Sequence, residues 1–200
     1  MTLRVEGLAV ARGGLAVLEG LSFAVAPGEA LVLRGPNGSG KTTLLRVLAG
    51  LAPPLRGRIE GPEAAYASHL DGIKATLTVE ENLRFWADLF GAAWDEGVLD
   101  AFDLRALRRR PGGTLSAGQA RRLGLARLGL TGRPLLLLDE PTVSLDAGSV
   151  ARLAGWLKAH LGRGGLAVIA THVPLGLAAP EVDLAAFCPA PEAAGADPFL

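Results

Sequence analysis

The most constraining feature of this chain is the segment at residues 35–42, which reads Gly-Pro-Asn-Gly-Ser-Gly-Lys-Thr and fits the pattern G-x-x-x-x-G-K-[ST]. An apolar run at residues 30–33 precedes it, and a helical pattern at residues 43–51 follows it. A strand, a glycine-rich turn and a helix in this order form the local structure that cradles nucleotide phosphates. The sequence therefore predicts a nucleoside triphosphate site at a strand-to-helix turn.

Each residue type in this loop has a physical role. Gly35, Gly38 and Gly40 allow backbone conformations closed to other residues, so successive N–H groups can converge on one anion. The helix that starts near Gly40 adds the positive end of its dipole at the same point. The Lys41 ammonium is expected to reach the outer phosphates, and the Thr42 hydroxyl is expected to bind Mg²⁺. The other loop residues expected to contact the nucleotide are Pro36, Asn37, Ser39 and Thr43.

The composition fits one domain with a full core and argues against a nucleic-acid partner. The chain has 200 residues, half of them hydrophobic, with 20 basic and 20 acidic side chains. A formal net charge of zero leaves no basic excess to neutralise a phosphate backbone. The one dense basic cluster, Arg105 with residues 108–110, is interpreted as the solvated last turn of a helix.

The chain is expected to be soluble and to work in a reducing compartment. Arg4 and Glu6 interrupt any apolar stretch that could serve as a signal-peptide core. The longest uncharged run, residues 164–180, is too short and too rich in proline for a spanning helix. The single cysteine, Cys188, excludes an internal disulfide. It precedes Pro189, a pair that ligates haem in some proteins, but a lone thiol is the favoured interpretation.

Alternating apolar runs and helical patterns predict an α/β fold with a mostly parallel sheet in one domain, residues 1–188, followed by a flexible tail, residues 189–200. Two β-rich stretches at residues 2–11 and 16–26 are expected to form an N-terminal antiparallel β subdomain. Crossover units on a parallel sheet are indicated by a helix, a strand, a helix and a strand at residues 116–130, 134–138, 147–161 and 166–170.

An α-helical subdomain is expected to be inserted at about residues 73–130. A helix over residues 77–91 starts with a capping box formed by Thr78 and Glu81. A second helix is predicted over residues 95–110, where a Pro-Gly-Gly break ends it.

Two acidic residues follow the apolar run at residues 135–138. This run is typical of a strand buried on both faces, whose carboxyl end opens onto a ligand crevice. Asp139 is expected to hold Mg²⁺ through a water, and Glu140 to orient or deprotonate the attacking water. The alternative interpretation is that Asp139 and Glu140 are two solvated side chains without a catalytic role. The presence of a phosphate loop earlier in the chain and of Asp146 a few residues later argues against that alternative.

The segment at residues 115–119, Leu-Ser-Ala-Gly-Gln, precedes a helix. Ser116 and Gln119 have the spacing of a capping box, yet the same geometry also presents N–H groups and a hydroxyl to an anion. With this segment in place, the chain resembles the nucleotide-binding subunit of ATP-binding cassette (ABC) transporters over nearly its full length. The motifs that carry the resemblance are the phosphate loop, residues 115–119, residues 135–140, residues 144–146 and His172.

The resemblance implies an ATPase whose sites are shared between two copies. In that family the signature segment, here residues 115–119, closes over the phosphate loop of a second subunit, so two ATP molecules lie within a head-to-tail homodimer. Ser116 and Gly118 would then contact the facing γ-phosphate, and Asp146 would communicate between the two sites. Gln119 and Asp146 are also assigned to the nucleotide site. His172 matches a histidine that hydrogen-bonds the γ-phosphate. The residues expected to act in catalysis are Glu140, His172 and Lys41.

Three positions depart from the usual family pattern. Arg12 stands where most members have an aromatic residue against adenine, and a guanidinium plane can also stack on a base. His69 aligns with a glutamine that contacts Mg²⁺ and the attacking water, so it is assigned to the metal site. Ala117 replaces the first glycine of the signature segment, which adds a methyl group but keeps Gly118.

These departures together resemble one subfamily, the ATP-binding subunit of the haem exporter of cytochrome c biogenesis. Segments at residues 72–74, 81–83 and 171–175 match it, whereas His-Leu-Asp at residues 69–71 departs from it. The resemblance implies a subunit on the cytoplasmic face of the inner membrane, docked on separate transmembrane subunits through a groove around residues 69–83. An ABC subunit for another cargo, such as a drug or a lipid, is the alternative.

Overall fold

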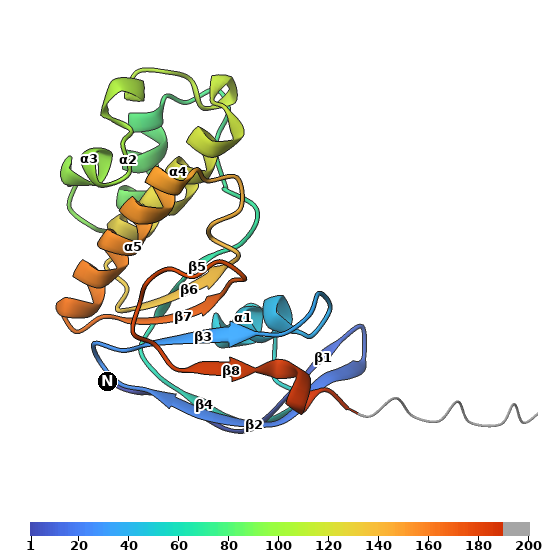
Figure 1. The fold of residues 1–200 in the computed structure, drawn as a ribbon. Helices are drawn as coiled ribbons and strands as arrows, with labels where there is room; N and C mark the ends of the chain where they lie inside the picture. Colours follow the sequence, from blue (N-terminus) through green and yellow to red (C-terminus); the bar gives the residue numbers. More distant parts are fainter. Residues whose placement is uncertain (190–200) are drawn as a thin grey trace, which may run out of the picture.

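The computed structural model describes residues 1–189 of the 200, and its centre is a five-stranded parallel sheet (Figure 1). The sheet order is β5-β6-β7-β3-β8, and every neighbouring pair is parallel. The carboxyl ends of these strands therefore meet at one edge, which confirms the predicted α/β class with a mostly parallel sheet. The strands are β3 (Ala30–Arg34), β5 (Ala64–Ala67), β6 (Leu135–Asp139), β7 (Leu166–Ala170) and β8 (Glu181–Asp183).

The predicted N-terminal antiparallel sheet is present as well. It has the order β2-β1-β4, with β1 (Leu3–Arg12), β2 (Leu15–Val25) and β4 (Arg56–Glu60). The β1–β2 turn consists of Gly13 and Gly14, both with positive φ (59° and 86°), as tight hairpin turns require. Arg12 is the last residue of β1, and the β1–β2 turn lies on the right-hand side of Figure 1.

The leucine run of β6 explains how the layers are held together. Leu135 and Leu137 pack in a core formed with α1 (Lys41–Leu48) and the antiparallel sheet, whereas Leu136 and Leu138 pack in a second core with α5 (Ala147–Gly162) and the helical segment. All four are at most 1% exposed. Successive side chains of a strand point to opposite faces, so an unbroken apolar run is what a strand covered on both faces requires.

Most of the remaining helices gather in one lobe at the top of Figure 1. The capping box that begins α2 is formed by Thr78 and Glu81, as predicted. The predicted helix over residues 95–110 is wrong in extent, because only α3 and a single 3-10 turn form there and Asp103 between them has a φ of 51°. The elements of the lobe are α2 (Val79–Phe90), α3 (Gly97–Ala101), η1 (Arg105–Leu107), η2 (Gly112–Thr114), α4 (Ala117–Ala126) and η3 (Arg127–Leu130).

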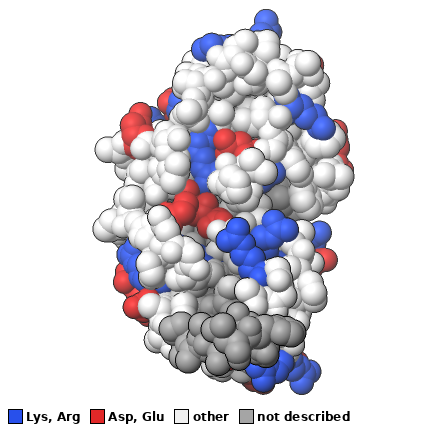
Figure 2. All heavy atoms as spheres, turned by 90° about the vertical axis from the view of Figure 1, so that its right-hand side faces the viewer, with Lys and Arg blue, Asp and Glu red and all other residues white. Residues whose placement is uncertain are grey.

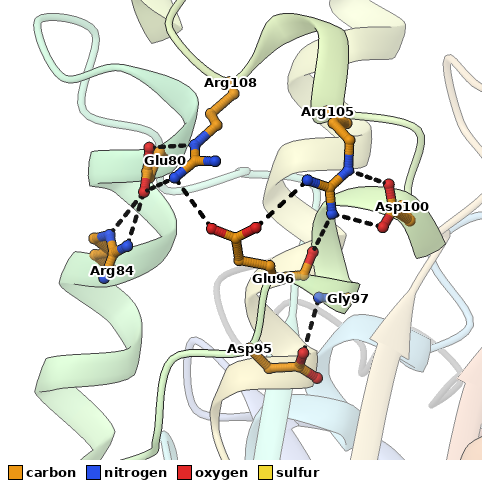
Figure 3. Close-up of polar contacts among 8 residues, drawn as sticks. All are labelled: Glu80, Arg84, Asp95, Glu96, Gly97, Asp100, Arg105 and Arg108. Atoms are coloured by element: carbon orange, nitrogen blue, oxygen red, sulfur yellow. Dashed lines mark hydrogen bonds and ion pairs between the residues drawn. The ribbon is translucent and has the colours of Figure 1, made fainter.

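Two of the four arginines in the basic cluster, Arg105 and Arg108, pair with carboxylates, and the long helix whose last turn they were expected to form is absent (Figure 3). Arg108 bridges two acids, with its Nη2 atom 2.7 Å from Glu80 and 3.1 Å from Glu96. Arg105 binds Asp100 through two nitrogens and also contacts Glu96. The Arg108 hydrogen bonds hold the pKa of Glu80 well below its ordinary value, at about 2. The ion pair between Arg108 and Glu80 thus fixes the segment after α3 against α2, where the sequence predicted a continuous helix.

The C-terminal part of the described chain adds two short elements that the sequence did not predict. The short strand β8 pairs with β3 at the sheet edge, and η4 (Leu184–Phe187) follows it. Cys188 is an exposed free thiol. The flexible tail expected from residue 189 falls on residues 190–200, which lie outside the described residues. Across residues 1–189, no helix combines the length and apolarity needed to cross a bilayer.

Candidate functional site

The loop between β3 and α1 has the backbone conformation that an anion cradle requires. Gly35, Gly38 and Gly40 all have positive φ, at 136°, 86° and 90°. A Cβ atom on Gly35 would lie 2.6 Å from the Ser39 hydroxyl, whereas one on Gly38 would meet no atom within 4 Å. No side chain caps the first turn of α1, so its N–H groups are available to a ligand. The loop therefore leaves space for a phosphate group and directs donors towards it.

Lys41 is nearly buried, at 8% exposed, and its ammonium is held by the loop itself. It donates to the carbonyl oxygens of Gly35 at 2.7 Å and Pro36 at 3.0 Å. These two contacts fold the side chain back over the loop and keep the positive charge beside the cradle. A phosphate oxygen can replace a carbonyl as acceptor and form a charge-assisted bond, which is the stronger of the two.

Two oxygen atoms that Mg²⁺ could use lie directly beside the loop. The Thr42 hydroxyl donates to Asp139 Oδ2 at 2.7 Å, and the Tyr66 hydroxyl approaches the same oxygen at 3.3 Å. Burial and the Asp139 charge raise the pKa of Tyr66 to about 12, so this hydroxyl stays protonated and orients the carboxylate. Sequence reasoning missed Tyr66, although it lies on β5, the strand paired with β6.

Seven of the residues predicted to bind the nucleotide line one hollow of about 240 Å³, together with Asp139 and Glu140, whereas Gly35, Pro36 and Ser39 do not line it. Lys41 and Asp139 share this hollow, which opens at the carboxyl edge of the sheet. On the face turned to the viewer in Figure 2, acidic and basic side chains lie next to one another across the middle of the molecule. The hollow is lined by Arg12, Val17, Asn37, Gly38, Gly40, Lys41, Thr42, Thr43, Asp139 and Glu140.

Glu140 and His172 extend from the ends of two neighbouring strands and face each other. Glu140 Oε1 lies 3.3 Å from His172 Nε2. The Glu140 backbone has a φ of 45°, and its amide donates to the Ala170 carbonyl at 2.8 Å. A left-handed conformation at a residue other than glycine costs about 1–3 kcal/mol and persists only where the surroundings impose it. Such strain is typical of functional positions.

The signature segment lies apart from this hollow within one chain. Ser116 caps α4 and forms a complete capping box with Gln119, whose amide donates to the Ser116 hydroxyl at 3.3 Å. Gly118 packs against the loop that follows Glu140: a Cβ atom on Gly118 would lie 2.9 Å from the Ser144 carbonyl oxygen. Asp146 caps α5 by accepting a hydrogen bond from the Ser149 amide at 2.7 Å. None of these residues lines the hollow at the phosphate loop.

The structure places His69 in a different hollow from Thr42 and Asp139. That second hollow measures about 160 Å³, and Glu140 forms a wall of both. No group of three or more His, Cys, Asp or Glu side chains within residues 1–189 is arranged to hold a metal ion. The Thr42 and Asp139 pair fits Mg²⁺ because this ion keeps waters and phosphate oxygens as its other ligands. A metal contact from His69 stays a prediction.

Comparison with known proteins agrees with this geometry. The ABC transporter family model matches residues 18–143. The chain belongs to this family. The cytochrome c biogenesis ATP-binding export protein CcmA of Ruegeria pomeroyi is 62% identical over 186 residues, which cover 92% of this chain and 91% of that protein. The predicted resemblance to the cytochrome c biogenesis subfamily is therefore confirmed, and the chain is an ABC-type ATPase.

Solved structures of ABC proteins share the fold. An ABC transporter ATP-binding protein from Pyrococcus furiosus superposes with a TM-score of 0.84 at 25% identity, over 94% of this chain and all of that one. A dimeric ATP-binding cassette, solved after hydrolysis with ADP and phosphate bound, has a TM-score of 0.75 at 20% identity and covers 86% of this chain and 88% of its own. The second likeness supports the fold alone.

Proposed function

We propose that this chain is the ATP-binding subunit of the haem exporter of cytochrome c biogenesis, positioned on the cytoplasmic face of the inner membrane. The observation that carries the proposal is the meeting of Lys41, Thr42, Asp139 and Glu140 around one hollow. This arrangement occurs in a chain that is 62% identical to a cytochrome c biogenesis export protein. ATP hydrolysis at this hollow would drive work by separate transmembrane subunits.

Each residue around the hollow is assigned one role in ATP hydrolysis. The loop amides and the Lys41 ammonium bind the phosphates and offset the charge that develops during transfer. A bound Mg²⁺ would be held by Thr42 and Asp139, and it would neutralise phosphate oxygens. Glu140 accepts a proton from the attacking water. His172, 3.3 Å from that carboxylate, fixes its orientation and can donate to a phosphate oxygen.

A second copy of the chain is proposed to complete each site. The signature segment offers the capped N-terminus of α4, but within one chain it does not line the hollow that holds Lys41. In a head-to-tail homodimer, Ser116 and Gly118 of one copy would face the phosphate loop of the other. A solved cassette of the same fold, 20% identical to this chain, is itself a dimer with ADP and phosphate bound.

The proposed docking groove for a membrane subunit lies between the sheet edge and the helical lobe. Its hollow measures about 240 Å³ and is walled by Leu51, Tyr66, Trp86 and Phe90, beside residues 69–83 rather than within them. Arg127 lies over the Trp86 ring at 4.7 Å, and its buried Nε atom has no hydrogen-bond partner among residues 1–189. Burial lowers the pKa of this guanidinium.

The deciding experiment is cytochrome c assembly in a bacterial strain that lacks its own copy of this subunit. The wild-type chain should restore covalently attached haem in periplasmic cytochrome c, and Glu140→Gln should not. Glu6→Gln, which changes an exposed carboxylate on β1, is the matched control and should restore assembly. A wild-type chain that hydrolyses ATP but leaves cytochrome c unassembled would refute the haem assignment and favour another cargo.

A further inference from the structure

Arg121 is a buried cation whose side chain contacts the backbone that carries the catalytic acids. It lies on α4, in the turn after the signature segment, and is 5% exposed. Its Nη2 donates to the carbonyl oxygens of Asp139 at 3.2 Å and Glu140 at 2.9 Å. Its Nε donates to the carbonyl oxygen of Pro141 at 3.4 Å. One guanidinium therefore binds three consecutive carbonyl groups at the end of β6.

The other side of the same guanidinium contacts the segment around His69. Its Nη1 donates to the Ser68 carbonyl at 2.7 Å and to the Asp71 carboxylate at 3.0 Å. Asp71 supplies the negative charge that a buried guanidinium requires, since an unpaired buried charge is strongly destabilising. The planar fork of arginine can bind all of these acceptors at once, which a lysine ammonium cannot do.

Arg121 donates a hydrogen bond to Glu140, a residue whose backbone is in a strained conformation. Glu140 has a φ of 45°, and its peptide groups are held from both sides. On one side its amide donates to the Ala170 carbonyl at 2.8 Å, and on the other its carbonyl accepts from Arg121 at 2.9 Å. Removing either contact would let Glu140 relax to an ordinary conformation and turn its carboxylate away from the hollow.

We propose that Arg121, paired with Asp71, is a positioning residue for ATP hydrolysis. It holds the Glu140 backbone in its left-handed conformation, so that the carboxylate faces both the hollow and His172. Because Arg121 belongs to α4, it also links that conformation to the helix that Ser116 caps. The inference rests on the proposed function in taking Glu140 as the base that acts on water.

The test is steady-state ATP hydrolysis by the full chain carrying Arg121→Lys. This change keeps a positive charge next to Asp71 but cannot bind the three carbonyls at the end of β6. We expect kcat to fall by about 10- to 100-fold, as displaced catalytic groups do, with the Kd for a fluorescent ATP analogue within about 2-fold of wild type. The matched control is Arg122→Lys, on the same helix, because the hydrogen bonds of Arg122 within residues 1–189 run to residues 102 and 103. Its kcat should stay near wild type.

A double variant separates positioning from a general loss of structure. In the Glu140→Gln background the base is already absent, so Arg121→Lys should lower the residual rate by less than about 2-fold. An equal loss in both backgrounds would show a structural role and overturn the proposal. If Arg121→Lys does not fold, Asp71→Asn replaces it, because this change removes the negative charge that holds the guanidinium against the carbonyl groups at the end of β6. It should lower kcat without changing Kd, and unchanged turnover would overturn the proposal.

The outcomes also separate this inference from the proposed function. Wild-type turnover in Arg121→Lys, with Glu140→Gln still inactive, refutes the positioning role and leaves the haem exporter assignment intact. Failure of the wild-type chain to restore cytochrome c assembly, with kcat still dependent on Arg121, refutes only the cargo. Wild-type turnover in Glu140→Gln refutes both the base assignment and the positioning role.

Discussion

Replacing Glu140 by glutamine is the most direct test of the hydrolytic site, because the structure limits what the substitution changes. The backbone contacts of Glu140 run to Ala170 and Arg121 through the amide and the carbonyl, and glutamine keeps both. The amide side chain also keeps the size and the reach to His172, which lies 3.3 Å from the carboxylate. What disappears is the ability to accept a proton from water. General-base catalysis contributes about 10²- to 10⁴-fold, or about 2.7–5.4 kcal/mol in activation free energy.

The assay is release of phosphate under saturating ATP, with equilibrium binding of ATP measured in parallel. We expect the rate to fall within that range while the Kd for ATP changes little, because in the proposed site the phosphates are bound by Lys41 and the loop amides and not by Glu140. Prolonged occupancy should also trap the nucleotide-bound dimer, which size-exclusion chromatography with ATP detects. Near-normal turnover in Glu140→Gln would remove this residue from the catalytic role.

Three further changes test other contacts. Lys41→Ala removes the ammonium beside the cradle and should abolish measurable binding of a fluorescent ATP analogue, whereas unchanged binding would contradict its phosphate role. Arg12→Ala should weaken nucleotide binding by about 2- to 20-fold through lost stacking, and equal affinities would show that Arg12 points elsewhere. Because pairing with Arg108 lowers the pKa of Glu80 from 4.5 to about 2, its stabilising effect is present above pH 4.5 and is lost as the pH falls towards 2. Glu80→Gln should therefore flatten the acid-induced loss of unfolding free energy in urea titrations, and a slope equal to wild type would count against this pairing.

The sequence predicted well those parts of the fold that depend on local chemistry. The positive φ values at Gly38 and Gly40 follow from the loop pattern, and the capping boxes at Thr78 and Ser116 follow from their side chains. The unbroken leucine run of β6 predicted a strand covered on both faces, which the two cores confirm. Each of these features is set by residues that are close in the chain, so a short window carries the information.

Contacts between distant segments left no such signal. Tyr66 meets Asp139 only because β5 pairs with β6 in parallel, and Arg121 binds carbonyl groups, which every residue has. A side chain that binds backbone atoms does not require a particular residue type at its partner position, so the sequence carries no sign of the contact. The helix predicted over residues 95–110 failed for a related reason, since Arg108 pairs with Glu80 on α2 and the left-handed Asp103 interrupts the backbone.

The unusual signature segment shows how these long-range contacts decide which substitutions are tolerated. Ala117 lines the 160 Å³ hollow, where its methyl group has room. One residue later, a Cβ on Gly118 would lie 2.9 Å from the Ser144 carbonyl, a backbone atom that cannot rotate away. Ser144 already has a φ of 65°, so a shift of its backbone would add strain to a strained residue. Position 117 therefore accepts a methyl group and position 118 does not, because the start of α4 packs directly on the loop that begins at Glu140.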